Sequence, residues 1–328
     1  MSQSRAEPFE KLPGIAGFSM SGQRAIVTGG SKGLGLAMAQ GLASCGASVM
    51  IASRHVEQAS AAAAAIADHF NVPTLAASVD VTKEEDCRKM VDLASERWGG
   101  VDILINSAGI NIRGPIESLS VDQFHQVMET NVTGTWLATR AAVGLMKANG
   151  YGRIIQIAST LGMVGLAGRT PYASSKGAIV QMTRTLALEL AEHGITCNAI
   201  CPGPFLTEMN LPIADSEDTR KFLIGAVAMG RWGRLEEIQG AAIYLASRSA
   251  SFTTGSLLVV DGGGTARCNL LPADGLASPN PLRKHSPTLA SLPPMRVLQA
   301  KHRKKTLRNH YILTFLLFRV PEIADQQP

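Results

Sequence analysis

The sequence has few of the features that mark secreted, membrane-spanning or metal-binding proteins. The chain of 328 residues has only 5 cysteines, and no two form a CxxC pair: Cys45, Cys87, Cys197, Cys201 and Cys268. We therefore expect reduced thiols and a cytoplasmic protein, without a disulfide framework. No apolar run is long enough to span a bilayer, and the first residues lack the apolar core of a secretory signal. The 7 histidines show no ligand spacing with cysteines or carboxylates, so no metal site is expected.

Charge is also sparse, and it is unevenly divided along the chain. Charged residues make up 17% of the sequence, with a formal net charge of +5. Residues 265–328 hold ten basic and three acidic residues, a net charge of +7, which leaves −2 for the preceding 264 residues. This last segment also has eight of the 16 prolines and one of the 32 glycines. We expect a lead-in over 1–22, one folded domain over 23–264 and a basic, proline-rich, poorly ordered extension over 265–328.

Between residues 23 and 264, short apolar runs alternate with helical patterns. Strands are expected at 24–28, 48–52, 74–79, 101–106, 152–158, 196–201 and 256–260. Helices are expected at 33–45, 56–70, 83–98, 121–148, 172–193 and 235–246, with an irregular loop over 205–232. The alternation predicts an α/β fold, a single doubly wound parallel sheet of seven strands with helices on both faces.

A glycine-rich turn follows the first expected strand and leads directly into a helix. Such a turn brings backbone N–H groups and the positive end of the helix against a pyrophosphate, and glycines let the backbone approach closely. The turn therefore predicts a dinucleotide site formed by Gly29, Ser31, Lys32, Gly33, Leu34 and Gly35. The spacing is Gly-x3-Gly-x-Gly rather than the GxGxxG of longer dinucleotide-binding enzymes.

The end of the second expected strand indicates which dinucleotide binds. An acidic residue there would accept the ribose 2′-OH of NAD, whereas a nearby arginine accommodates the 2′-phosphate of NADP. The strand is followed by Ser53 and Arg54, with no acidic residue before Glu57. Lys32 offers a second positive charge to the same phosphate, so we expect NADP(H) in preference to NAD(H).

Two further turns are expected beside the cofactor. Asp80 and Val81 follow the third strand and suit a contact with the adenine edge. The fourth strand ends in a tight turn beside the cofactor ribose, to which we assign Asn106, Ala108 and Gly109. Both assignments depend on the carboxyl ends of parallel strands meeting at one edge of the sheet.

The residues best suited to catalysis are a tyrosine and a lysine on one helix. Tyr172 and Lys176 are four residues apart, so their side chains share one helix face. A free tyrosine has a pKa of about 10 and is a weak base at neutral pH, and a nearby ammonium favours the tyrosinate. Ser159, at the end of the fifth strand, can hold a substrate oxygen against the Tyr172 hydroxyl. Asn131 can interrupt its helix and hold a water that links Lys176 to solvent, which completes a proton relay.

Together these motifs resemble those of the classical short-chain dehydrogenase/reductase family over about residues 20–264. The resemblance implies a Rossmann-type fold and NADP-dependent interconversion of a secondary alcohol and a ketone. It implies that Tyr172 is the acid/base, that Ser159 orients the substrate, that Lys176 binds the nicotinamide ribose, and that Pro202, Gly203 and Thr207 approach the nicotinamide. It also implies a homo-oligomer, a tetramer or a dimer, with the C-terminal strand at a subunit interface. The chain departs from the family pattern at Ser107, where a second Asn is common, and in its long extension.

The substrate is less well indicated than the chemistry. The domain resembles gluconate 5-dehydrogenases and 3-oxoacyl-[acyl-carrier-protein] reductases. Arg113 follows the turn after the fourth strand, and Arg169 lies just before Tyr172, so either can pair with a carboxylate. We expect the substrate to be a sugar acid, such as gluconate or 5-ketogluconate, and we expect Arg113, Ser159 and Tyr172 to bind it.

Three alternatives remain open at this point. The first is a 3-oxoacyl-[acyl-carrier-protein] reductase, although the net charge of −2 on residues 1–264 does not favour an acidic carrier protein. The second is a non-catalytic dinucleotide-binding protein, which would not be expected to retain all four relay residues. The third is nucleic-acid binding through the basic extension, which would depend strongly on salt. We expect a small carbonyl or alcohol as partner, and neither a membrane nor a nucleic acid.

Overall fold

The computed structural model describes residues 12–217 and 224–266 of the protein. Apart from Thr265 and Ala266, the predicted extension lies outside the described residues, as do residues 1–11. The described part forms one all-parallel sheet in the order β3-β2-β1-β4-β5-β6-β7. The strands are β1 (Arg24–Thr28), β2 (Ser48–Ser53), β3 (Thr74–Ser78), β4 (Ile103–Asn106), β5 (Gly152–Ile157), β6 (Ile195–Pro202) and β7 (Leu257–Val260). The predicted doubly wound sheet of seven strands is confirmed.

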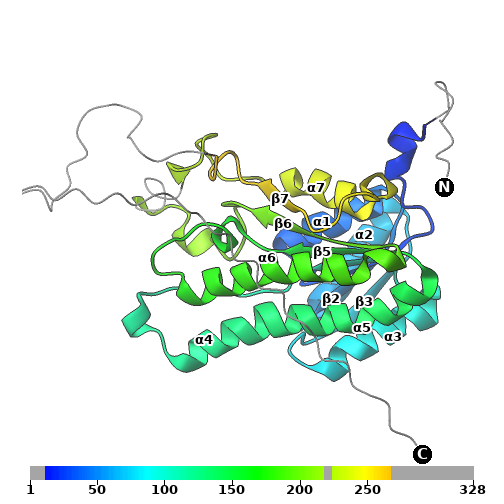
Figure 1. Ribbon diagram of the computed structural model, residues 1–328, viewed down its shortest axis with the longest axis horizontal. Helices are drawn as coiled ribbons and strands as arrows, with labels where there is room; N and C mark the ends of the chain where they lie inside the picture. The colour runs from blue at the N-terminus through cyan, green and yellow to red at the C-terminus, as the bar shows by residue number, and fades with distance from the viewer. Residues whose placement is uncertain (1–11, 218–223, 267–328) are drawn as a thin grey trace, which may run out of the picture. The chain divides into compact units, whose positions relative to one another are not determined.

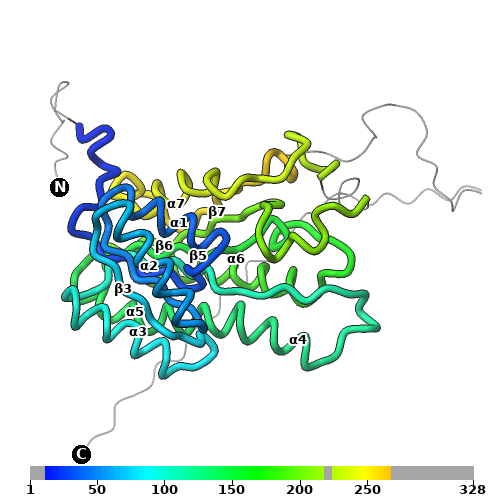
Figure 2. The backbone as a smooth tube through the Cα atoms, turned by 180° about the vertical axis from the view of Figure 1, so that it is seen from behind, coloured from blue at the N-terminus to red at the C-terminus, as the bar shows by residue number. Residues whose placement is uncertain are grey.

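Helices cover both faces of this sheet (Figure 1). They are α1 (Gly33–Ser44), α2 (Val56–Phe70), α3 (Glu84–Trp98), α4 (Val121–Met128), α5 (Gly134–Asn149), α6 (Thr170–Leu190) and α7 (Gln239–Ala246). One hydrophobic cluster joins the sheet to α1, α2 and α7, and a second joins it to α3, α5 and α6. Figure 2, seen from behind, shows α1, α2 and α7 nearest the viewer. None of the described helices combines the length and apolarity needed to cross a bilayer.

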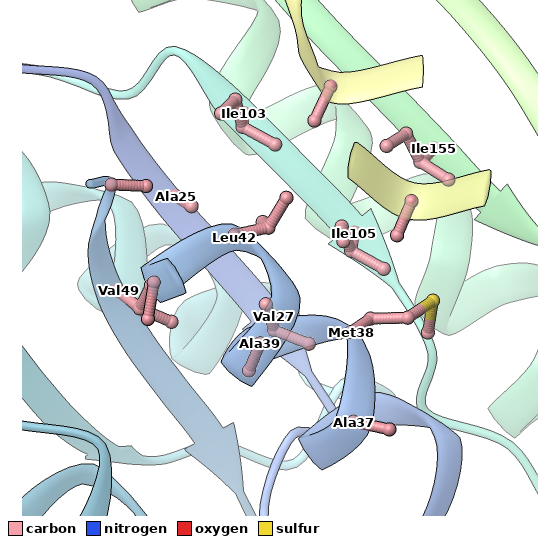
Figure 3. Close-up of a cluster of buried hydrophobic side chains, with 14 of the residues drawn as sticks. Ala25, Val27, Ala37, Met38, Ala39, Leu42, Val49, Ile103, Ile105 and Ile155 are labelled. Atoms are coloured by element: carbon pink, nitrogen blue, oxygen red, sulfur yellow. The ribbon is translucent and has the colours of Figure 1, made fainter. Parts of the chain in front are cut away.

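The alternation of side chains along the central strands builds the two cores. In β1, Ala25 and Val27 belong to the cluster beneath α1, whereas Ile26 belongs to the cluster on the opposite face. Figure 3 shows the first cluster, in which Met38 and Leu42 of α1 lie over the strands. All five of these side chains are fully buried. Because both faces are covered, the central strands are apolar throughout, which is the pattern that the sequence shows.

The strand order places a crevice at the centre of the sheet. β1 pairs with β2 on one side and with β4 on the other, with Thr28 level with both Ala52 and Asn106. The chain therefore reverses its direction of winding at β1, and the loops after β1 and β4 leave in opposite directions. Ligands of doubly wound sheets bind at this switch point, outside the carboxyl ends of the strands.

The long helix predicted over 121–148 is interrupted. A π-helical turn over Glu129–Thr133 separates α4 from α5. Asn131 lies inside this turn and is buried, so the prediction of one continuous helix is wrong at the residue that was expected to disturb it. Short π-helical segments inside α-helices occur frequently at functional sites.

Candidate active site

A cleft of about 570 Å³ opens at the carboxyl ends of the strands. Its walls come from the turns after β1, β2, β3, β4, β5 and β6, together with one face of α6. Most of the predicted cofactor and catalytic residues line it: Gly29, Ser31, Lys32, Gly33, Leu34, Gly35, Ser53, Arg54, Asp80, Val81, Ala108, Gly109, Ser159, Tyr172, Lys176, Pro202, Gly203 and Thr207. Three predicted site residues, Asn106, Asn131 and Arg113, are not in its wall.

The glycine turn owes its composition partly to the protein's own packing. A Cβ on Gly29 would come within 2.8 Å of the Ala108 backbone, and one on Gly35 would collide with the Gly29 carbonyl. A Cβ on Gly33 would have room, because the atom nearest to it would be in the Thr207 side chain at 3.8 Å. The φ of 56° at Gly33 nevertheless favours glycine.

The amino end of α1 is free to bind an anion. No side chain caps this end, and the first turn of the helix contains no acidic residue. The first N–H groups of a helix have no partner within the helix, and the helix dipole adds a partial positive charge there. Gly33, Leu34 and Gly35 of this turn line the cleft. The residues present therefore fit a pyrophosphate.

The turn after β2 carries positive charge without an acidic residue. Arg54 lines the cleft, and the preceding Ser53 is linked to the glycine turn by a Ser31 Oγ–Ser53 Oγ hydrogen bond of 3.1 Å. Lys32 also lines the cleft, and its contact with the 2′-phosphate stays a prediction. Its Nζ is 2.6 Å from Oε2 of Glu208, in the segment after β6. Lys32 therefore has a protein partner across the cleft, and Arg54 is left as the main candidate to bind a 2′-phosphate.

Asp80 is held in place at the end of β3. Its Oδ1 accepts hydrogen bonds from the Thr82 backbone N–H at 3.1 Å and from the Thr82 hydroxyl at 2.8 Å. Burial alone would raise the pKa of this carboxyl, but the bonds from Thr82 outweigh that effect and the pKa lies below its usual value. Asp80 is therefore ionised at neutral pH and can accept a hydrogen bond from a ligand.

The Asn106 side chain lies inside the protein and not in the cleft wall. Its Nδ2 donates to Thr139 Oγ1 at 2.9 Å and to Gln156 Oε1 at 3.0 Å, inside the protein. The side chain is almost fully buried between β4, β5 and α5. The structure therefore places it in a polar network under the turn, and only Ala108 and Gly109 of the predicted set reach the cleft.

Tyr172, Lys176 and Ser159 come together in the cleft wall. Tyr172 and Lys176 lie on successive turns of α6, with Lys176 Nζ 5.7 Å from the centre of the Tyr172 ring. Ser159 follows β5 and is also buried. Lys176 Nζ donates to the Ile157 carbonyl at 2.6 Å, a partner that no sequence pattern identifies. This bond ties the lysine to the end of the same strand that carries the serine.

Burial and neighbouring charges act on these groups in opposite directions. Burial raises the pKa of Tyr172, while the Ser159 hydroxyl and the charges of Arg113 and Arg169 favour its ionised form. The tyrosine therefore stays protonated at neutral pH and is poised as an acid. Burial lowers the pKa of Lys176 to about 8. The two arginines thus act on Tyr172 in the same direction as we expected of the Lys176 ammonium.

Asn131 links the π-helical turn to the catalytic helix. Its Oδ1 accepts from the Ile110 backbone N–H at 2.8 Å, and its Nδ2 donates to the Ile110 carbonyl at 3.0 Å and to Ser175 Oγ at 2.9 Å. Its side chain therefore has protein partners at both ends, and the water that links Lys176 to solvent stays a prediction. Asn131 fixes the turn after β4 against α6, one residue from Lys176. Ser175 was not predicted, although its position beside Lys176 offered a signal.

Arg113 is bonded to residues of the cleft wall, although it is not part of that wall itself. Its Nη2 donates to Asn210 Oδ1 at 2.8 Å and to the Met209 carbonyl at 3.2 Å, and both of these residues line the cleft. Its Nε is buried without a hydrogen-bond partner. Arg169 lies nearby, since each arginine affects the charge state of Tyr172. No acidic residue in the described part of the chain forms an ion pair with either arginine.

Metal ions in proteins are held by sets of donor side chains from His, Cys, Asp and Glu. No group of three or more His, Cys, Asp or Glu side chains is placed to hold an ion in residues 12–217 and 224–266. Four of the cysteines lie in this range and are free thiols: Cys45, Cys87, Cys197 and Cys201.

Comparisons with known proteins agree with this geometry. A family model described as enoyl-(acyl carrier protein) reductase, of the short-chain type, matches residues 29–265. Gluconate 5-dehydrogenase of Gluconobacter oxydans is 39% identical over 249 residues, which cover 75% of this chain and 96% of that protein. 5-Keto-D-gluconate 5-reductase of Escherichia coli K12 is 34% identical over 246 residues, which cover 75% of this chain and 96% of that protein.

Solved structures give the same result. A gluconate 5-dehydrogenase from Burkholderia cenocepacia, in complex with NADP and tartrate, superposes with a TM-score of 0.74 at 36% identity, covering 76% of this chain and 98% of that one. Structures with bound NADP also include a protein from Beutenbergia cavernae described as a gluconate 5-dehydrogenase, at a TM-score of 0.72 and 34% identity, covering 76% of this chain and 99% of that one. This chain therefore belongs to the short-chain dehydrogenase/reductase family and is an oxidoreductase that uses a nicotinamide dinucleotide.

Proposed function

We propose that this protein interconverts the alcohol and ketone of a sugar acid, such as gluconate and 5-ketogluconate, with NADP(H) as the hydride carrier. The observation that carries the proposal is the position of Arg113. Its guanidinium is bonded to Met209 and Asn210 of the cleft wall, its charge acts on Tyr172, and its buried Nε has no hydrogen-bond partner. A guanidinium that lacks a carboxylate inside the protein is suited to bind one on the substrate. The relatives named for gluconate and ketogluconate support the same choice.

The chain's own residues supply the proton side of the reaction. When bound, the nicotinamide supplies or accepts the hydride. In the reducing direction Ser159 holds the substrate oxygen and Tyr172 donates the proton to it, since its raised pKa keeps the hydroxyl protonated at neutral pH. Lys176, tied to the Ile157 carbonyl, binds the nicotinamide ribose and forms the next member of the relay. Asn131 holds the turn after β4 against α6 so that these groups keep their positions.

The preference for NADP(H) rests on Arg54. It follows β2 with no acidic residue before Glu57 in the chain, which is the arrangement that accommodates a 2′-phosphate. NADP in solved structures of relatives supports this choice. The remaining cofactor contacts follow the cleft wall, from Asp80 at the adenine end to Pro202, Gly203 and Thr207 at the nicotinamide end.

We further propose that the protein works in the cytoplasm and forms a homo-oligomer, either a tetramer or a dimer. β7 is at the edge of the sheet, and Val259 on it is 37% exposed. Phe124 of α4, Trp136 of α5 and Leu188 of α6 are also exposed apolar side chains, and such surfaces often mark contacts between subunits. Light scattering coupled to gel filtration tests this, because a monomer at micromolar concentration would contradict it.

The decisive test of the substrate is a paired turnover assay. The loss of NADPH absorbance is followed with 5-ketogluconate and, in parallel, with an acetoacetyl thioester, and both are repeated with NADH. Turnover of 5-ketogluconate with NADPH supports the proposal. Turnover of the thioester alone would contradict the sugar-acid substrate and favour a 3-oxoacyl-[acyl-carrier-protein] reductase. The matching family model is described as a reductase of acyl carrier protein substrates, which is why this alternative is tested.

A further inference from the structure

Two loops that are far apart in the sequence bring two arginines close enough for their charges to act on one another and on Tyr172, although neither arginine lines the cleft itself. The Gly114 backbone N–H donates to the Gly168 carbonyl at 3.2 Å, which joins the loop after β4 to the loop before α6. Arg113 precedes the first of these glycines and Arg169 follows the second. Arg169 Nη1 donates to the same Gly168 carbonyl at 3.0 Å. This shared carbonyl holds the two guanidinium-bearing residues side by side.

The two guanidiniums are not neutralised by the protein. Neither has a carboxylate partner among residues 12–217 and 224–266, and each side chain is partly withdrawn from water. Burial lowers the pKa of both, and the charge of Arg113 lowers the pKa of Arg169 further. Arginine nevertheless stays charged in proteins. Two partly buried like charges are unfavourable unless an anion joins them.

The hydrogen-bond donors of the pair are also incompletely used. Arg113 Nη2 is bound to Met209 and Asn210, but its Nε is buried without a partner. Among the residues that the structure describes, the Arg169 guanidinium has one hydrogen bond, to the carbonyl of its own neighbour Gly168. A carboxylate has two oxygens and can accept from two guanidiniums at once.

We propose that Arg169 and Arg113 together form an anion site that selects substrates carrying a carboxylate, with Arg169 as a second specificity-determining residue. This inference rests on the proposed function, because it assumes that the substrate enters beside Tyr172. The substrate carboxylate lies between the two guanidiniums while its ketone or alcohol carbon faces Tyr172 and Ser159. Neutral sugars and ketones have no carboxylate for the two arginines to bind, so they should bind to the cleft more weakly.

The first test is a binding measurement that does not depend on turnover. The protein saturated with NADPH is titrated with D-gluconate and with the neutral polyol glucitol, followed by NADPH fluorescence, since an alcohol cannot react with the reduced cofactor. The wild-type protein should bind gluconate roughly 10- to 100-fold more tightly than glucitol, the effect of one or two charge-assisted hydrogen bonds. Arg169→Met should remove most of this difference, and Arg169→Lys should restore part of it.

A matched control is Arg97→Met, which removes an exposed arginine from the last turn of α3, before the amino end of β4, whereas the cleft lies at the carboxyl ends of the strands. This variant should keep the wild-type ratio, and all variants should keep their affinity for NADPH. Equal binding of gluconate and glucitol by the wild-type protein, or an unchanged ratio in Arg169→Met, overturns the anion site.

Turnover then separates this inference from the proposed function. If the ratio behaves as expected but 5-ketogluconate is not reduced, the sugar-acid substrate is wrong and the anion site stands, for another carboxylate. If 5-ketogluconate is reduced and Arg169→Met raises its KM no more than the KM for a neutral ketose, the substrate stands and the role of Arg169 is wrong.

Discussion

At the residue scale, single side chains decide which ligand the cleft accepts. Arg54 is the clearest case, because it lines the cleft just after β2, where we propose that the 2′-phosphate binds. Changing Arg54→Glu should weaken NADPH binding roughly 10- to 100-fold, since a charge-assisted bond is lost and a repulsion is gained. NADH, which has no 2′-phosphate, should be affected much less. Equal losses for both dinucleotides would refute the assignment of Arg54.

The protonation of Tyr172 gives a second prediction at this scale. The pKa of its hydroxyl lies above the usual value, mainly through burial, so the group is protonated at neutral pH. Reduction uses the protonated form and oxidation the ionised form. The kcat for oxidation of gluconate should therefore rise between neutral and alkaline pH, while the kcat for reduction should not. A parallel rise in both directions would contradict a proton transfer through this residue.

The sequence indicates most of these residues but not their partners. The glycine turn, Tyr172 and Lys176 follow from spacing, and the structure brings them to one cleft. By contrast, Lys32 pairs with Glu208, which is 176 residues away in the chain, and Asn106 bonds to Gln156 and Thr139. Contacts of this kind depend on how the elements pack, and no local pattern in the sequence reports them.

At the element scale, the interruption between α4 and α5 is the feature that periodicity missed. One extra residue in a π-helical turn hardly changes a hydrophobic pattern that spans several turns, so the segment was expected to be one helix. The asparagine at this point provides the physical reason, since its side chain competes for backbone partners outside the helix. In the structure it takes both backbone groups of Ile110.

This interruption carries a prediction of its own. Asn131→Ala leaves the Ile110 N–H and carbonyl without their partner, and it removes the bond to Ser175. We expect the free energy of unfolding to fall by about 1–3 kcal/mol and kcat to fall with it. Asn149→Ala, at the exposed end of α5, is the matched control and should change neither quantity. Wild-type kcat and stability in Asn131→Ala would show that the turn is not needed to position the catalytic helix.

At the scale of the whole molecule, the predicted division of the chain can be tested directly. The sheet, helices and cleft that the structure describes end before Thr265, whose hydroxyl donates to Asp261 Oδ2 at 2.7 Å. A variant that ends after Ala266 should therefore keep the cofactor affinity and kcat of the full chain, as measured by NADPH titration and turnover. A large loss of either would show that residues 267–328 belong to the functional domain.

The same pair of proteins tests whether the basic extension binds nucleic acid. We expect no such function, so the full chain and the truncated variant should bind DNA and RNA equally weakly. A salt-dependent affinity that disappears on truncation would restore that alternative.

The fold was predictable at this scale because seven apolar strands and their helices follow one simple alternation. The structure of the segment after Ala266 could not be predicted in the same way, because its composition matches no packed element. The expectation of a poorly ordered extension lies outside the described residues.

The central claim is that this cleft reduces a ketone with NADPH, using the Tyr172 hydroxyl as the proton donor. The most direct test compares wild-type protein with Tyr172→Phe in 5-ketogluconate reduction, with NADPH affinity measured in the same samples. We predict that the variant binds NADPH as tightly as the wild type and loses at least about 100-fold in kcat, the low end of what general acid catalysis contributes. Wild-type turnover in Tyr172→Phe would contradict the account.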